Sequence, residues 1–147
     1  MQTAGDLILR RAGALGLAAL TVWREARSES YACKLAVAYV IATRAQQGRW
    51  GGVTILDVIS APKQFTSMTY PGDPQLTRFP TEGPAWRDCL EATAAALFMA
   101  EPNPMPGADT YHDTSIATPA AWAKKTRLGQ IDRIIFFKTD FKTEETS

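Results

Sequence analysis

A short charged segment separates two apolar stretches, and this arrangement constrains the fold more than any other feature of the chain. The segment from Thr21 to Ser30 (TVWREARSES) places two carboxylates and two guanidinium groups within six residues. Apolar sequence with helical spacing precedes and follows it. Two core-forming helices therefore meet at a charged corner, which is either solvated or presents an acid to a cleft.

The first apolar stretch predicts a helix that carries Glu25 at its C-terminal end. Leu15, Ala18, Ala19 and Val22 recur at helical spacing and form one apolar stripe. Glu25 follows Val22 by three residues, so its side chain projects near that stripe. An apolar helix end suits a carboxyl group that must hold a proton near neutral pH.

The second apolar stretch predicts a central buried helix, Tyr31–Gln47, with Ser28 or Ser30 as its N-cap. Thr54 is expected to cap a short helix, Ile55–Ser60.

The rest of the chain predicts a loop, one more helix and a small β element. Residues 62–83 are polar and interrupted by Pro and Gly, and loops of this length are often functional. Pro84 opens a helix over Ala85–Ala100. Strands are expected at Thr110–His112 and Ile131–Lys138. The core face of the expected helix includes Trp86, Leu90, Ala94 and Leu97.

Composition fits one globular domain over residues 1–147, with a core over about residues 15–138 and a frayed polar tail at 142–147. Hydrophobic residues make up 46% and charged residues 21% of the chain. We expect an α+β fold that is mainly α, and a monomer. The formal net charge of +1 gives no reason to expect a nucleic-acid partner, and no apolar run has the length of a stable membrane insertion.

The two cysteines predict core residues. Cys33 and Cys89 each lie inside a helical pattern, and whether they pair stays open. One histidine cannot build a zinc site with them at any usual spacing. We therefore expect no metal and no cofactor.

The stretch Leu20–Arg44 resembles the SleB-type cell-wall hydrolases, the spore cortex-lytic enzyme family. Those proteins show Glu-Ala-Arg-x-Glu, followed by an apolar Ala-Val-Ala-x-Val-Ile helix that ends near Arg. The matching residues here are Glu25, Ala26, Arg27, Glu29, residues 36–41 (AVAYVI) and Arg44.

Later segments extend the resemblance over about residues 15–138. Gln64–Ser67 is similar to the family's Gln-Phe-Ser loop. Its C-terminal half is matched by Gly107, Ala108, Tyr111, His112, Gly129, Phe136 and Phe137. The chain departs from the family at Ser28 (usually Gly), Thr43 (usually Asn) and Phe137 (often Tyr). These departures concern substrate preference more than chemistry.

The resemblance implies a lysozyme-like domain, similar to lytic transglycosylases and goose lysozyme, that acts on peptidoglycan. Such domains cleave the MurNAc–GlcNAc β-1,4 bond, often as lytic transglycosylases that leave an anhydro-muramoyl end. The family's catalytic glutamate falls on Glu25. The compact size, without wall-binding repeats, favours a phage endolysin that waits in the host cytoplasm for holin-dependent release to the periplasm or cell wall. Ala12–Trp23 also resembles a short signal h-region, but its cleavage would remove the helix that carries Glu25.

The chemistry requires an acid that protonates the departing glycosidic oxygen. Glu25 fits, and in an anhydro-forming reaction the same carboxylate then acts as base on the sugar's own 6-hydroxyl. A hydrolytic muramidase would instead need a second carboxylate at roughly 5–9.5 Å. Asp73, Asp109 and Asp113 are the loop candidates.

Other residues of the matching segments are candidates for substrate binding or support. Glu29 either forms a salt bridge with Arg27 or Arg44 or contacts substrate. Tyr111 positions substrate or contacts Glu25, or is a half-buried strand aromatic. His112 is a further candidate for substrate binding or support, although a lone His is more often a structural hydrogen-bonding residue. The loop candidates for the sugar cleft are Gln64, Phe65, Thr66 and Ser67, with a buried Phe anchor as the alternative.

Two competing classes remain. A lone His is more often structural, but His112 with Cys33 would suit a wall thiol peptidase. Cys33 lies inside an apolar helix, which argues against it. A non-catalytic glycan-binding domain is the second class, and the presence of Glu25 argues against that.

Overall fold

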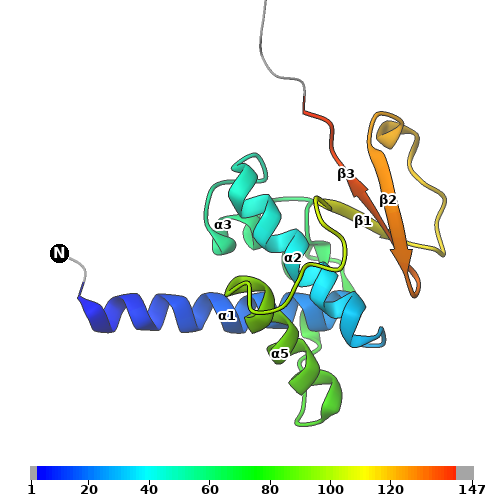
Figure 1. Ribbon diagram of the computed structural model, residues 1–147. Helices are drawn as coiled ribbons and strands as arrows, with labels where there is room; N and C mark the ends of the chain where they lie inside the picture. Colours follow the sequence, from blue (N-terminus) through cyan, green and yellow to red (C-terminus); the bar gives the residue numbers. More distant parts are fainter. Residues whose placement is uncertain (1–2, 142–147) are drawn as a thin grey trace, which may run out of the picture.

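The two long helices follow one another across the charged corner. The C-terminal half of the first lies within the body of the molecule, and its N-terminal half extends beyond the other elements (Figure 1). The computed structural model describes residues 3–141. The helices are α1 (Ala4–Ala26), α2 (Tyr31–Gln47), α3 (Ile55–Ser60), α4 (Thr66–Thr69) and α5 (Pro84–Leu97), with 3₁₀ turns η1 (Pro74–Thr77) and η2 (Ala120–Trp122). The strands are β1 (Thr110–Asp113), β2 (Thr126–Ile131) and β3 (Ile134–Lys138). The predicted α+β class with a dominant helical part is confirmed.

The core forms where α1, α2 and α5 pack against one another. In α1, Ala18, Ala19 and Val22 are fully buried, as their spacing predicts. Small side chains at these positions let the helix backbones approach closely, so dispersion contacts are dense. The stretch Ala12–Trp23 therefore lies within one helix whose packed part begins at Ala18, whereas Ala12 and Leu17 are exposed. No helix within residues 3–141 is both long and apolar enough to cross a membrane.

Local signals set the bounds of α2 and α3. Ser30, not Ser28, is the N-cap of α2, and its Oγ accepts a hydrogen bond from the Cys33 N–H at 3.2 Å. Gly48 ends α2 with φ 68°, a left-handed conformation that glycine adopts without strain. Thr54 caps α3 through a capping box with Asp57. Both helices match the predicted ranges.

Helix α5 differs from its prediction. It ends at Leu97, three residues earlier than expected, because Met99 takes a left-handed φ of 54°. The fully buried face carries the small residues Cys89, Ala92, Thr93 and Ala96. The predicted core residues Trp86, Leu90, Ala94 and Leu97 are only half-buried. The close approach of α5 to α1 and α2 leaves room for small side chains only, so Trp86, Leu90 and Leu97 lie at the edges of the contact.

The polar segment 62–83 is partly ordered as short helices, which its composition did not predict. It contains α4 and η1. Asp73 caps η1, because its side chain accepts a hydrogen bond from the Gln75 N–H at 2.8 Å. The segment therefore has defined geometry beside the C-terminal half of α1.

The sheet has the strand order β1-β3-β2, and both pairings are antiparallel. The prediction of one strand over Ile131–Lys138 is wrong. The chain turns at Asp132 and Arg133, where Asp132 has φ 51°, and Ile131 pairs with Ile134. Strand β1 matches its prediction with one added residue. The predicted frayed tail, 142–147, lies outside the described residues.

Candidate active site

Glu25 lies in the last turn of α1, where three distant segments of the chain meet. Its side chain is half-buried. The Ser67 hydroxyl of α4 donates a hydrogen bond to Glu25 Oε2 at 2.8 Å, and the Tyr111 hydroxyl of β1 donates a short hydrogen bond to Oε1. Both carboxylate oxygens are therefore oriented by fixed donors. The structure thus brings together Glu25, Ser67 and Tyr111.

The phenol of Tyr111 is a hydrogen-bond donor to Glu25 and stays protonated. Burial, followed by the charge and the hydrogen bond of Glu25, holds the pKa of Tyr111 well above its ordinary value, while the charge of Arg44 opposes this shift. The ring packs against Phe136 with 6.0 Å between ring centroids. The phenol therefore keeps its proton and its position beside the carboxylate over the whole neutral range.

Arg44 is a buried cation close to this pair. Only 5% of the residue is exposed, and its guanidinium lies 4.2 Å from the ring centroid of Trp50 and 5.0 Å from that of Phe65. Its Nε donates to the Asp109 carbonyl oxygen at 2.6 Å. Burial lowers the pKa of Arg44, and the charges of Tyr111, Asp109 and Glu25 counteract this. Its positive charge is therefore held within electrostatic reach of Glu25.

The four loop candidates take different places. Phe65 is buried under the Arg44 guanidinium, so it is the packed anchor and not a platform for a sugar. Gln64 is exposed. Thr66 is also exposed, and its hydroxyl donates to Asp73 Oδ2 at 3.0 Å. Of the four side chains, Ser67 is the one bonded to Glu25.

Glu29 forms an ion pair with a residue that the sequence did not indicate. Its Oε1 lies 3.2 Å from Nη2 of Arg133, in the β2–β3 turn, so the predicted pairing with Arg27 or Arg44 is wrong. The turn folds back onto the corner between α1 and α2, and only the tertiary fold creates this contact. Glu29 supports the corner, whereas its role as a direct substrate contact stays a prediction.

Glu29, Cys33 and Asp132 are the one group of possible metal ligands within the described part of the chain, with ligand atoms within 4.8 Å of one another. Burial, and then the Glu29 and Asp132 charges, raise the pKa of Cys33 to about 12. The protonated thiol donates a weak hydrogen bond to the Ile131 carbonyl oxygen at 3.7 Å. The Asp132 carboxylate accepts from the Ser30 N–H at 2.7 Å. These hydrogen bonds join the β2–β3 turn to the start of α2.

His112 lies on the other face of β1 from Tyr111, because successive side chains of a strand alternate. Its Nδ1–H donates to the Asp113 carbonyl oxygen at 2.8 Å, and its Nε2 accepts from the Thr118 hydroxyl at 3.0 Å. The ring is buried between aromatic neighbours, with centroids 5.5 Å from those of Trp122 and Phe137. The structure does not bring His112 to Glu25.

A thiol peptidase also has no support in this geometry. Both ring nitrogens of His112 have other partners, and Cys33 bonds to a backbone carbonyl. Cys33 and Cys89 are both buried free thiols, so they do not form a disulfide with each other.

The three candidates for a second carboxylate differ in access. Asp109 is fully buried and accepts hydrogen bonds from Gln47, Thr110 and Thr139. Asp73 is committed to the cap of η1. Asp113 is exposed, and hydrogen bonds with Ser115 lower its pKa. Asp113 follows Tyr111 by two residues, so it lies on the same face of β1.

Sequence reasoning missed Arg24 as a support of the site and considered Asp109 only as a possible second carboxylate. Both residues are buried, and each has partners far away in the chain. Their charge alone indicates surface residues. An acidic or basic residue embedded in an apolar pattern is the only signal that the sequence offers for either one.

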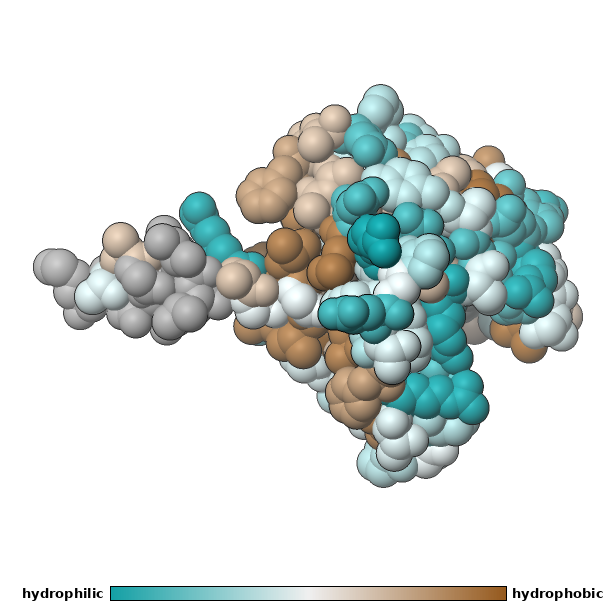
Figure 2. All heavy atoms as spheres, turned by 90° about the horizontal axis from the view of Figure 1, so that it is seen from below, coloured by the Kyte–Doolittle hydropathy of each residue, from teal (hydrophilic) through white to brown (hydrophobic). Residues whose placement is uncertain are grey.

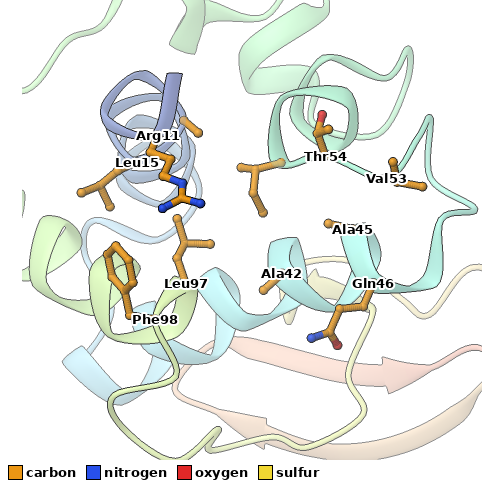
Figure 3. A pocket seen from close by; sticks show the side chains of 11 residues that line it. Arg11, Leu15, Ala42, Ala45, Gln46, Val53, Thr54, Leu97 and Phe98 are labelled. Atoms are coloured by element: carbon orange, nitrogen blue, oxygen red, sulfur yellow. The ribbon is translucent and has the colours of Figure 1, made fainter. Parts of the chain in front are cut away.

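An apolar groove lies elsewhere, between α1, α2 and α5 (Figure 3). Leu15, Ala42, Val53 and Leu97 are among its lining residues, and Glu25 is not. Hydrophobic surface also gathers where α1 joins the body (Figure 2). The groove is thus separate from the candidate active site.

Comparisons with known proteins assign this mainly helical domain to a family. The Cell Wall Hydrolase family matches residues 28–137, so the chain belongs to this family. The match includes Ser67 and Tyr111 but begins three residues after Glu25. The assignment of Glu25 to the candidate active site therefore depends on its hydrogen bonds with Ser67 and Tyr111 and not on the family match. No curated protein matches the chain.

Two solved structures show the same fold. One is the catalytic domain of the germination-specific lytic transglycosylase SleB from Bacillus anthracis, with 26% identity and a TM-score of 0.68 over 85% of this chain and 93% of that one. The other is the catalytic domain of Bacillus cereus SleB, with 27% identity and a TM-score of 0.68 over 85% of this chain and 89% of that one. The predicted SleB-type family is confirmed.

Proposed function

We propose that this protein cleaves the MurNAc–GlcNAc β-1,4 bond of peptidoglycan as a lytic transglycosylase, with Glu25 as the one catalytic acid and base. The observation that carries this proposal is the pair of hydroxyl donors on the Glu25 carboxylate. The similarity to SleB, a lytic transglycosylase, supports the reaction type.

The reaction needs one proton to leave Glu25 and one to return. Protonated Glu25 gives its proton to the glycosidic oxygen as the bond to C1 of MurNAc breaks. The Glu25 carboxylate then takes the proton of the C6 hydroxyl while that oxygen bonds to C1. The products are the shortened strand with a free GlcNAc hydroxyl and a 1,6-anhydro-muramoyl end, and Glu25 is again protonated.

Ser67 and Tyr111 act on the deprotonated form of Glu25, which exists between the two proton transfers. Their hydroxyl groups stabilise the carboxylate once it has lost its proton, and they aim one oxygen at the reacting sugar. Since the phenol of Tyr111 keeps its proton, it adds no second negative charge to the site.

Digestion of purified peptidoglycan by wild type and Glu25→Gln tests the reaction, with muropeptides identified by mass. We expect anhydro-muramoyl products from wild type and none from Glu25→Gln. Equal digestion by both proteins would contradict the role of Glu25. Cut peptides with intact glycan would contradict the glycosidase assignment.

The alternative is a hydrolytic muramidase, and one observation favours Asp113 as its second carboxylate. Asp113 is exposed and shares a face of β1 with Tyr111, which contacts Glu25. Reducing muramoyl ends that carry an added water, lost in Asp113→Asn, would favour this mechanism. Anhydro ends that persist in Asp113→Asn would exclude it.

We further propose a role as a phage endolysin that stays in the host cytoplasm until a holin releases it. Expression in bacteria with and without a co-expressed holin tests this role. Lysis only with the holin is expected, and lysis by the protein alone would contradict the need for release.

A further inference from the structure

Arg24 is a buried cation that binds backbone oxygens instead of carboxylates. Only 8% of the residue is exposed. Its Nη1 donates to the carbonyl oxygen of Ser67 at 3.0 Å, its Nε to that of Arg78 at 3.1 Å and its Nη2 to that of Leu76 at 3.3 Å. Among residues 3–141 no ion pair to Arg24 is found. Burial lowers the pKa of Arg24, opposed by the charge of Asp73.

These three contacts connect both ends of one loop to α1. Residues 67–78 contain two prolines and one glycine, and none of them belongs to a strand. Arg24 Nη1 also lies 3.3 Å from the sulfur of Met68, and the guanidinium is 4.9 Å from the ring centroid of Phe79. α4 and η1 have hydrogen bonds of their own. One planar, five-donor group therefore anchors both of these short turns to α1 and fixes where they lie.

Ser67 is held at two atoms by consecutive residues of α1. Arg24 binds its carbonyl oxygen, and Glu25 accepts the hydrogen bond from its hydroxyl. The direction of the hydroxyl depends on the position of the Ser67 backbone. A backbone shift of 1 Å would lengthen or misdirect the bond to Glu25.

We propose that Arg24 is a positioning residue for the reaction. It holds the Ser67 backbone so that the hydroxyl orients Glu25, and it keeps residues 67–79 in place beside the carboxylate. This inference rests on the proposed function, since it assigns to Arg24 an effect on the reaction of Glu25.

The test is a double-mutant cycle between Arg24 and Ser67. Arg24→Met keeps the apolar stem and removes all donors, and Ser67→Ala removes the hydroxyl. We expect Arg24→Met to lower kcat on peptidoglycan by about 10- to 100-fold, with a small change in KM. Because Arg24 acts through Ser67, the double variant should be no slower than the slower single variant. Additive losses would overturn the proposal.

Arg27→Met is the matched control. Arg27 also connects α1 to the loop, because its Nη1 donates to Gln75 Oε1 at 2.8 Å, but it does not touch Ser67. We expect a smaller loss of kcat for Arg27→Met and no coupling to Ser67→Ala. If Arg27→Met coupled to Ser67→Ala as strongly as Arg24→Met does, Arg24 would only support the loop in general. That result would overturn its specific role in positioning Ser67.

Arg24→Lys is a milder second variant, for use if Arg24→Met does not fold. A lysine reaches one carbonyl oxygen, so an intermediate kcat and the same coupling to Ser67→Ala are expected. If Arg24→Met does not fold, the cycle with Arg24→Lys decides in the same way.

A measurement without substrate separates this proposal from the proposed function. Amide hydrogen exchange of residues 66–79 should accelerate in Arg24→Met, while exchange in the sheet stays unchanged. Unchanged exchange in the loop would overturn the role of Arg24 whatever the reaction. Wild-type cleavage by Glu25→Gln would overturn the proposed function and leave the exchange result standing.

Discussion

Single side chains decide the chemistry of this site, and Tyr111 is the clearest case. Tyr111→Phe removes the hydroxyl that donates to Glu25 and keeps the ring that packs on Phe136. The carboxylate then loses one of its two donors and can rotate. We expect kcat for glycan cleavage to fall by about 10- to 100-fold, with the thermal midpoint nearly unchanged. The measurement is the release of soluble muropeptides from purified peptidoglycan.

Tyr70→Phe is the matched control for this prediction. Tyr70 is exposed at the end of α4, so loss of its hydroxyl should leave the rate unchanged. A wild-type rate in Tyr111→Phe would show that the contact with Glu25 has no role in the reaction.

At the same scale, the sequence predicts catalytic candidates better than their supports. Glu25, Ser67 and Tyr111 lie in segments whose sequence resembles the family, so they could be named as candidates. Arg24 could not be predicted as a buried loop support, because its carbonyl partners lie 43 to 54 residues away. The sequence of a charged residue and its neighbours does not indicate which distant carbonyl oxygens it contacts in the folded chain.

At the scale of elements, helices with local signals were predictable and strands without them were not. The bounds of α2 follow from Ser30 and Gly48, which act within a few residues of the helix ends. Strand β2 has a weak pattern, interrupted by Gly129 and by a register shift. Pairing with β3 across a two-residue turn creates it, so the single-strand prediction over 131–138 failed there.

The corner between α1 and α2 allows a test of one helix cap. The sequence left Ser28 and Ser30 open as caps, and the structure assigns the cap to Ser30. Ser30→Ala leaves the Cys33 N–H without its partner and should lower the free energy of unfolding by about 1 kcal/mol. Urea denaturation monitored by circular dichroism measures this change.

Ser28→Ala serves as the comparison. Ser28 is exposed, and its hydroxyl accepts a hydrogen bond from Arg133 Nη2 at 3.2 Å. Exposed contacts of this kind contribute little, so we expect a change within about 0.5 kcal/mol. A larger loss in Ser28→Ala than in Ser30→Ala would contradict the assigned cap.

At the scale of the whole molecule, the three-helix core should make folding sensitive to alkaline pH. Burial raises the pKa of Cys33 to about 12 and that of Cys89 to about 11. In the unfolded chain, thiols have a pKa of about 8.5. Above that pH the unfolded chain releases thiol protons that the folded chain retains, so stability present below about pH 8.5 is lost as the pH rises towards 11–12.

Urea denaturation between pH 7 and pH 10.5 measures this loss. We expect the free energy of unfolding to fall by about 1.4 kcal/mol per thiol for each pH unit above 9. Cys89→Ala leaves a small cavity and lowers stability at every pH, but it removes one of the two titrating thiols, so its slope above pH 9 should be about half that of wild type. Parallel curves for the two proteins would mean that Cys89 ionises equally in both states. The wild-type slope would then come from Cys33 and from other groups, such as Tyr31, whose pKa is raised to about 12.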